Sequence, residues 1–528
     1  MPNRRQFLRA GAVAGAAFVA PSFRARAASG FPFEEATLDD LQQRMQKGAL
    51  NARGLTQAYL DRIAALDRSG AMLRSILDTN PEALAIAESL DDERRRQGPR
   101  GPLHGIPVLL KDNLDTHDRM TTTAGSLALE GSIPARDCFV AERLRAAGAI
   151  LVAKANMSEW ANIRSNRSSS GWSARGGQCR NPYSLDRNPC GSSSGTAVAV
   201  AANLVAVGIG TETDGSIVCP SNNCGLVGIK PTLGLVSRAG IIPIAHSQDT
   251  AGPMCRTLRD AAILLSAIAG VDPRDAETGN AQGHLHADYT RFLDPAGLRG
   301  ARLGVFRKAF GFHPGVDRCM EDALAEMKRL GATLVDPADI PHVGEYDETE
   351  LLVLLYELKA DLDAYLGGLG PAARVKSLAD VIRFNEENKD REMTCFGQEL
   401  FIQAQEKGPL TDPAYRDALE KNRRLSRLEG IDAVMDAHQL DAVVAPTGGP
   451  AWTTDCVNGD HFGGGSSTPA AVAGYPNITV PAGEVFGLPV GISFIGRAWS
   501  EPVLLRLAYA FEQGTRHRKP PAFRGSAI

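Results

Sequence analysis

Two loops rich in serine and glycine flank a short apolar element in the middle of the chain. The first loop spans residues 190–195 and carries three consecutive serines, and the second spans residues 210–216 and ends in Ser216. Glycine lets backbone N–H groups approach a substrate closely, and such groups can stabilise a developing oxyanion. A serine hydroxyl is a weak nucleophile until a base removes its proton. The two loops therefore indicate hydrolytic chemistry, provided that a base lies nearby.

Three interpretations of these loops compete. A flexible linker is disfavoured because continuous apolar runs lie on both sides. Gly191-x-Ser193-x-Gly195 formally matches the nucleophile elbow of α/β-hydrolases, but no segment of clear β character precedes it, as that elbow requires. In the third interpretation the serines act with Lys111, which ends the apolar run 106–110. A lysine is a base near neutral pH only if burial lowers its pKa by roughly 3 units from ~10.4.

The rest of the chain predicts the elements that hold these residues. With 43% hydrophobic and 22% charged residues, the 528-residue chain is typical of a globular protein and not of a disordered one. Short apolar runs alternate with helix-like segments, which favours an α/β protein with a largely parallel or mixed sheet. We expect strands near residues 106–110, 150–153, 302–306, 333–335, 441–445, 478–480 and 491–495, and helices near 37–47, 55–66, 81–96, 140–147, 316–330 and 418–438.

The sequence resembles the amidase signature family along most of its length. The segments that carry the resemblance are 101–112, 191–195, 210–217, 224–232, 234–238, 247–253 and 487–491. Such a resemblance implies one large α/β domain over about 30–520, with a central mixed sheet surrounded by helices. The signature region would then span about 165–255, and a variable helical region on the substrate side about 345–440. Segments 170–178 and 211–220 are similar to bacterial peptide amidases in particular.

The resemblance also implies a role for each chemical group. Ser216 would be the nucleophile, Ser192 the bridging serine after a cis peptide bond, and Lys111 the base. The two serines are 24 positions apart, as in the family pattern. The oxyanion hole would consist of the backbone N–H groups of Thr213, Asp214, Gly215 and Ser216.

The sequence departs from the family in two places. Asp214 stands where most relatives have glycine, and we expect it to narrow the choice of substrate. Val218 and Cys219 stand where many relatives place an arginine that holds a free carboxylate, so a malonamate-like substrate is disfavoured. The resemblance implies release of ammonia from C-terminal amides of peptides through an acyl-enzyme. Hydrolysis of other small, aryl or fatty amides is the alternative, and a non-enzymatic binding protein on the same fold is a further one.

The expected ligands are limited to the amide substrate. The sequence has no HExxH and no paired CxxC, so we expect no metal and no cofactor. A formal charge of −4 gives no reason to expect nucleic acid as a partner. We also expect no obligatory partner subunit. The family's amidotransferase subunits work with a tRNA-binding partner in the cytoplasm, a role that an export signal and an acidic chain oppose.

The N-terminus predicts export. Arg4-Arg5 within a twin-arginine pattern, an apolar run over 10–20 and an Ala25-Arg26-Ala27 site indicate a signal peptide over residues 1–27. The apolar run is too short to span a bilayer, and no other segment approaches the ~20 apolar residues of a membrane helix. We therefore expect a periplasmic or secreted protein without stable membrane insertion.

Nine cysteines are spread over the chain without a tight framework. Folding before export favours mostly buried, reduced thiols, although an oxidising compartment permits disulfides. The candidate pairs are Cys179 with Cys190 and Cys219 with Cys224, which are near each other in the sequence.

Overall fold

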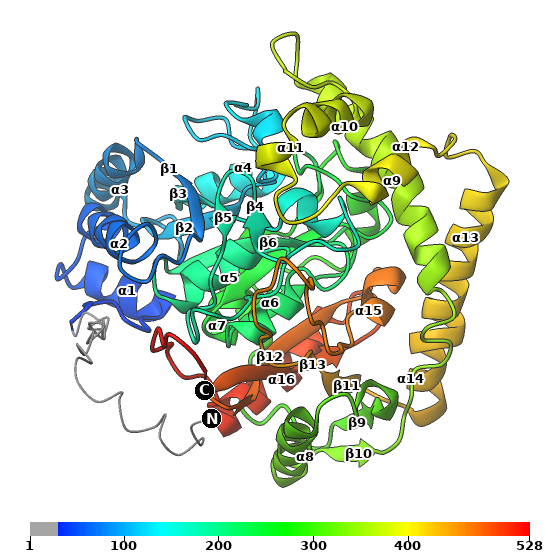
Figure 1. Cartoon of the computed structure of the whole chain (residues 1–528). Helices are drawn as coiled ribbons and strands as arrows, with labels where there is room; N and C mark the ends of the chain where they lie inside the picture. The colour runs from blue at the N-terminus through cyan, green and yellow to red at the C-terminus, as the bar shows by residue number, and fades with distance from the viewer. Residues whose placement is uncertain (1–29, 528) are drawn as a thin grey trace, which may run out of the picture. The chain divides into compact units, whose positions relative to one another are not determined.

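A large mixed β-sheet forms the centre of the molecule (Figure 1). The computed structural model describes residues 30–527, so the predicted signal peptide over residues 1–27 lies outside the described residues. From Phe33 onward the described chain forms one compact unit. Within residues 30–527 this sheet has eleven strands in the order β1-β3-β2-β6-β8-β7-β12-β13-β11-β9-β10. The predicted α/β fold with a central mixed sheet in a single domain is confirmed.

Parallel pairing is confined to two parts of the sheet, β3-β2-β6 and β11-β9-β10, and the other neighbouring strands are antiparallel. The strands are β1 Ile76–Thr79, β2 Pro107–Lys111, β3 Ile150–Ala155, β6 Val207–Glu212, β7 Val227–Lys230, β8 Thr250–Cys255, β9 Arg302–Val305, β10 Thr333–Val335, β11 Ala442–Pro446, β12 Asn477–Val485 and β13 Leu488–Ile495. The strands β2, β3 and β6 are buried at every position, as expected for strands that helices cover on both faces.

Helices surround the sheet and begin with side-chain caps where the local sequence provides them. Thr37 and Asp40 form a capping box at the start of α1, and the Thr257 hydroxyl caps α7. The helices before the signature region are α1 Leu38–Gln46, α2 Ala52–Leu66, α3 Ala83–Gln97 and α4 Phe139–Ala146. Those that follow are α5 Ser194–Ala201, α6 Val218–Asn223, α7 Leu258–Ile268, α8 Pro314–Arg329, α15 Thr468–Ala473 and α16 Glu501–Thr515. A small second sheet pairs β4 Trp172–Ser173 with β5 Gly177–Gln178.

The helix α5 is buried along its whole length, against β2, β3, β6 and β8. Its small side chains allow this close approach. A Cβ atom on Gly195 would collide with the backbone oxygens of Asn156 and Ser75, so only glycine fits at this position. Because α5 begins two residues after Ser192, its tight packing holds the first serine loop against the ends of the central strands.

A separate group of helices lies beside the sheet, with α9 and α13 packed side by side (Figure 1). These helices are α9 Asp347–Gly368, α10 Leu378–Glu387, α11 Lys389–Glu392, α12 Glu399–Gln405, α13 Pro413–Arg423 and α14 Asp432–His438. The single helix predicted over 418–438 is interrupted, because residues Arg424–Ile431 form a π-helical segment in which Gly430 departs from helical geometry. Apolar periodicity cannot reveal such an insertion, since the pattern continues across it.

Candidate active site

Lys111 ends β2 and Thr211 lies near the end of β6, and these neighbouring parallel strands bring both residues to the same edge of the sheet. The Lys111 side chain is fully buried. Its Nζ is 2.7 Å from Ser192 Oγ, 2.8 Å from Thr211 Oγ1 and 3.2 Å from the Thr211 carbonyl oxygen. Burial lowers the pKa of Lys111 to about 7, although the nearby Asp249 and Glu212 act in the opposite direction. The structure therefore places a lysine that is easily deprotonated beside Ser192.

The two serine loops lie next to each other. The Gly191–Ser192 peptide bond is cis, as the family resemblance implies. The backbone N–H of Ser193 donates to the carbonyl oxygen of Ser216 at 3.2 Å, and Ser193 Oγ donates to the carbonyl oxygen of Thr211 at 3.0 Å. Among residues 30–527 no hydrogen bond joins the hydroxyls of Ser192 and Ser216, and catalytic contacts often tighten only when substrate binds.

The turn before Ser216 presents unused backbone donors. In the described part of the chain the N–H groups of residues 213–216 donate to no protein acceptor, whereas those of Ile217 and Val218 donate to Glu212 Oε2 at 2.7 and 3.0 Å. Gly215 has a φ of 76°, a left-handed conformation that favours glycine. The turn can therefore offer several N–H groups to a developing oxyanion, at the position predicted from the sequence.

Asp214 turns its carboxylate away from this backbone. Its Oδ2 accepts a hydrogen bond of 2.7 Å from Thr468 Oγ1, at the start of α15. Burial raises the pKa of Asp214, and the hydrogen bonds from Ser467 and Thr468 oppose that rise. The acidic side chain thus connects the turn to Ser467 and to the start of α15.

A cavity of about 210 Å³ opens beside Ser192. Asn113, Ser192, Thr211 and Thr213 line its inner part, residues 241–244 form an apolar wall, and Arg238, His246 and Asp361 lie further out. The amide Nδ2 of Asn113 donates to Thr211 Oγ1 at 3.0 Å. Sequence reasoning did not identify Thr211 as a contact of the base, or Asn113 as the partner of Thr211. Thr211 lies within the matched segment 210–217, and Asn113 directly follows the matched segment 101–112.

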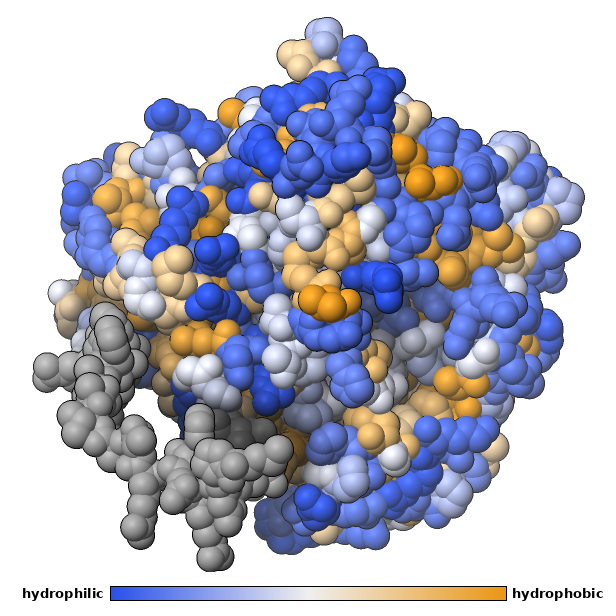
Figure 2. All heavy atoms as spheres, viewed as in Figure 1, coloured by the Kyte–Doolittle hydropathy of each residue, from blue (hydrophilic) through white to orange (hydrophobic). Residues whose placement is uncertain are grey.

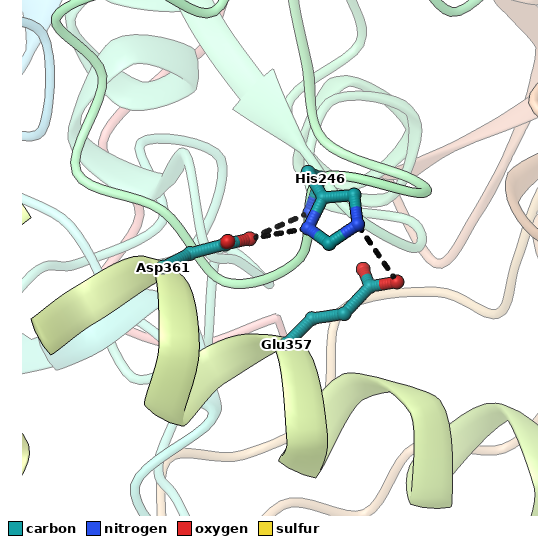
Figure 3. A group of neighbouring side chains, drawn as sticks. All are labelled: His246, Glu357 and Asp361. Carbon is teal, nitrogen blue, oxygen red and sulfur yellow. Dashed lines mark hydrogen bonds and ion pairs between the residues drawn. The ribbon is translucent and has the colours of Figure 1, made fainter. Parts of the chain in front are cut away.

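His246, Glu357 and Asp361 form a cluster near the outer part of this cavity (Figure 3). The imidazole Nδ1 is 2.8 Å from Asp361 Oδ2, and Nε2 is 3.4 Å from Glu357 Oε1. Glu357 also accepts hydrogen bonds from Tyr415 Oη and the backbone N–H of Ser247. The hydrogen bond to Asp361 raises the pKa of His246, as does the charge of Glu357. These contacts connect the loop 238–249 to α9.

Trp172 and Trp452 do not line this cavity. Trp172 packs edge-on against Phe396, and the guanidinium of Arg164 lies near both rings. Trp452 contacts Cys190 and Cys219 and lines a different cavity, together with His313 and His461.

The disulfides differ from the pairs suggested by the sequence. The structure pairs Cys190 with Cys219 and Cys395 with Cys456. The candidate pairs Cys179 with Cys190 and Cys219 with Cys224 are therefore wrong, because proximity along the chain says little about proximity across loops. Among residues 30–527 the five remaining cysteines are free, and four of them are buried thiols, as expected: Cys138, Cys179, Cys224 and Cys255.

Comparisons with known proteins agree with this geometry. A family model described as Amidase matches residues 54–505. A probable amidase of Arabidopsis thaliana is 43% identical over 507 residues, which cover 94% of this chain and 93% of the relative. The solved peptide amidase from Stenotrophomonas maltophilia is 54% identical, with a TM-score of 0.90 over 93% of this chain and 99% of that one. A structure of peptide amidase PAM bound to the competitive inhibitor chymostatin is equally similar, with 54% identity and a TM-score of 0.90.

Proposed function

This chain belongs to the amidase family and is an amide hydrolase, and from that premise we propose that it removes the C-terminal amide of peptides. The observation that carries the proposal is the buried Lys111 amine at 2.7 Å from Ser192, beside a turn of unused N–H groups that ends in Ser216. The choice of peptide amides is supported by the similarity to peptide amidase in both sequence and fold.

The proposed mechanism uses the three side chains as a proton relay. Neutral Lys111 accepts the proton of Ser192, Ser192 accepts that of Ser216, and Ser216 Oγ bonds to the carbonyl carbon of the amide. The backbone N–H groups of residues 213–216 stabilise the oxyanion. The C–N bond then breaks as the relay returns the proton to the nitrogen, and ammonia leaves. Water attacks the acyl-enzyme by the same relay and releases the peptide acid and Ser216.

A substrate panel tests the proposal. Ammonia release should be greatest from dipeptide amides and much lower from acetamide, anilides and long-chain amides. Ser216→Ala should abolish this activity and the labelling of the protein by a fluorophosphonate. A preference for anilides or long-chain amides would replace the peptide substrate with the alternative. Labelling that persists in Ser216→Ala would contradict the assignment of the nucleophile.

We also propose that the enzyme acts outside the cytoplasm. The support is the twin-arginine pattern with its apolar run and Ala25-Arg26-Ala27 site. Cell fractionation of a host with a twin-arginine pathway should find the activity in the periplasm or medium. Replacing Arg4 and Arg5 together by lysine should retain the protein in the cytoplasm, whereas the same change at Arg24 and Arg26 serves as a control that leaves the twin arginines intact. Unchanged export of the Arg4 and Arg5 variant would refute this route.

A further inference from the structure

A disulfide joins the two loops that carry the serines. Cys190 lies two residues before Ser192, and Cys219 lies three residues after Ser216, in the first turn of α6. Their Cα atoms are 6.0 Å apart, a usual separation for bonded cysteines. The bond therefore closes a covalent ring that contains both serines together with α5 and β6.

Within the described part of the chain, three hydrogen bonds also join these two loops, all through Ser193. The Ser193 hydroxyl donates to the Thr211 carbonyl oxygen at 3.0 Å and accepts from the Thr211 N–H at 3.2 Å. Among residues 30–527 only the third hydrogen bond, from Ser193 N–H to the Ser216 carbonyl oxygen, connects residues 190–194 with residues 213–219. Its length of 3.2 Å is at the long end of the normal range. Lys111 is hydrogen bonded to Ser192 and not to Ser216. The position of Ser216 relative to the other two groups thus depends on the disulfide together with the hydrogen bonds of Ser193 and those that Glu212 accepts from Ile217 and Val218.

The surroundings hold the disulfide in place. Cys190 and Cys219 are 5% and 7% exposed, and both contact the Trp452 ring. The Cys190 N–H donates to Asn188 Oδ1 at 2.8 Å, and the Asn188 N–H donates to the Trp452 carbonyl oxygen at 2.7 Å. The Cys219 N–H donates to the Gly215 carbonyl oxygen at 2.8 Å, within the turn that precedes the nucleophile. The backbone N–H of each cysteine is therefore hydrogen bonded close to one of the two serines.

We propose that Cys190 and Cys219 are positioning residues, whose disulfide aligns Ser216 with Ser192 and Lys111 so that full activity requires the oxidised pair. The inference rests on the proposed function of the three side chains. A relay needs its groups within hydrogen-bond reach, and a displacement of about 1 Å can cost about a hundredfold in rate.

The oxidation step balances through thiol–disulfide exchange. The two thiols lose two protons and two electrons as the S–S bond forms, and a disulfide oxidant such as oxidised glutathione is reduced to two thiols. Such an oxidant is supplied in the compartments that exported proteins reach. An enzyme that folds in a reducing cytoplasm would therefore gain its full activity only after the proposed export.

Controlled reduction of the purified protein tests the inference. Dithiothreitol is added under native conditions, and alkylation with mass spectrometry shows which disulfide has opened. Opening Cys190–Cys219 should lower kcat for a dipeptide amide about tenfold to a hundredfold with little change in KM, since the loss is of alignment. The rate of fluorophosphonate labelling should fall in the same proportion, and oxidised glutathione should restore both.

The second disulfide offers a matched control. Cys456 is exposed and Cys395 half-buried, so dithiothreitol should open this pair first. The double variant Cys395→Ser, Cys456→Ser should lose activity on reduction as the parent does. The double variant Cys190→Ser, Cys219→Ser should have low activity that dithiothreitol does not change, while circular dichroism shows that it is folded.

The outcomes separate this inference from the proposed function. An untreated enzyme that neither hydrolyses peptide amides nor reacts with the fluorophosphonate contradicts the proposed function. An active enzyme whose kcat is unchanged after complete opening of Cys190–Cys219 overturns the positioning role alone. If the Cys190→Ser, Cys219→Ser variant does not fold, the reversible reduction of the parent protein decides the question.

Discussion

Lys111 owes its basicity to its place at the end of a buried strand. Burial lowers its pKa to about 7, and the chemistry requires the neutral amine. We therefore expect kcat/KM for an amide to rise as the pH increases through about 7 and then to level off. A pH–rate profile of the purified enzyme measures this directly.

The matched variant for this prediction is Lys111→Arg, because a guanidinium keeps its proton at every accessible pH. Its activity should be lower by about 10²–10⁴-fold, the contribution of a general base, without recovery at alkaline pH. A parent profile that is flat across neutral pH would show that Lys111 is not the titrating base.

Asp214 is expected to affect substrate choice through its contact with the start of α15. Because its carboxylate accepts from Thr468 Oγ1, the side chain connects the oxyanion turn to α15. Asp214→Gly should widen the range of amides hydrolysed, since it releases this connection while the backbone N–H remains. Comparison of kcat/KM across the substrate panel checks this, with Thr468→Val as the variant that removes the same hydrogen bond from the other side. An unaltered profile in both variants would exclude the role.

At the scale of elements, the loop 238–249 and helix α9 meet through a charged cluster. His246 lies between Asp361 and Glu357, and its pKa is raised chiefly by the hydrogen bond to Asp361. A group with a raised pKa in the folded state stabilises the fold fully below its unfolded pKa, here ~6.5. That contribution is lost as the pH rises through the folded pKa.

The His246→Gln variant should lack the part of the pH dependence of stability that comes from this imidazole. The free energy of unfolding of the parent should exceed that of His246→Gln at acidic pH, and the difference should shrink as the pH rises above about 6.5. Urea unfolding at a series of pH values measures both proteins. A difference that stays constant with pH would mean that the imidazole does not titrate in this contact.

At the scale of the whole molecule, a buried arginine attaches the helical group α9–α14 to the rest. Arg164 is fully buried, with ion pairs to Glu159 and to Glu392 at the end of α11. Glu392 also accepts hydrogen bonds from Ser126 Oγ at 3.1 Å and Leu127 N–H at 2.7 Å. The surface visible in Figure 2 is mainly hydrophilic with scattered apolar residues, as is usual for a globular protein.

Removal of this arginine should be costly. Arg164→Ala leaves two buried carboxylates without their cation and should lower the free energy of unfolding by about 3–5 kcal/mol. The exposed pair of Arg383 with Asp380 provides the control, since Arg383→Ala should cost no more than about 1 kcal/mol. Denaturant unfolding compares the two variants. Similar losses would show that the buried cluster contributes no more than a surface pair.

Within residues 30–527 no helix has the length and apolar character of a membrane span.

All the strands predicted from the sequence correspond to strands of the large sheet. They are the segments 106–110, 150–153, 302–306, 333–335, 441–445, 478–480 and 491–495. Others, such as β1, β7 and β8, were not predicted. Their short, glycine-containing or polar segments lack the periodicity that marks a strand, and they form because neighbouring strands supply hydrogen-bond partners.

The sequence by itself determined the family, the α/β class and the residues Lys111, Ser192 and Ser216 as candidates, because spacing and periodicity are properties of the chain. The tertiary structure alone decided which groups meet across distant segments. It paired Cys190 with Cys219 and brought His246 to Asp361 on α9. It also buried Lys111, which lowers the pKa of that lysine. Burial, and contact between distant segments, arise from packing in three dimensions, which local sequence patterns do not specify.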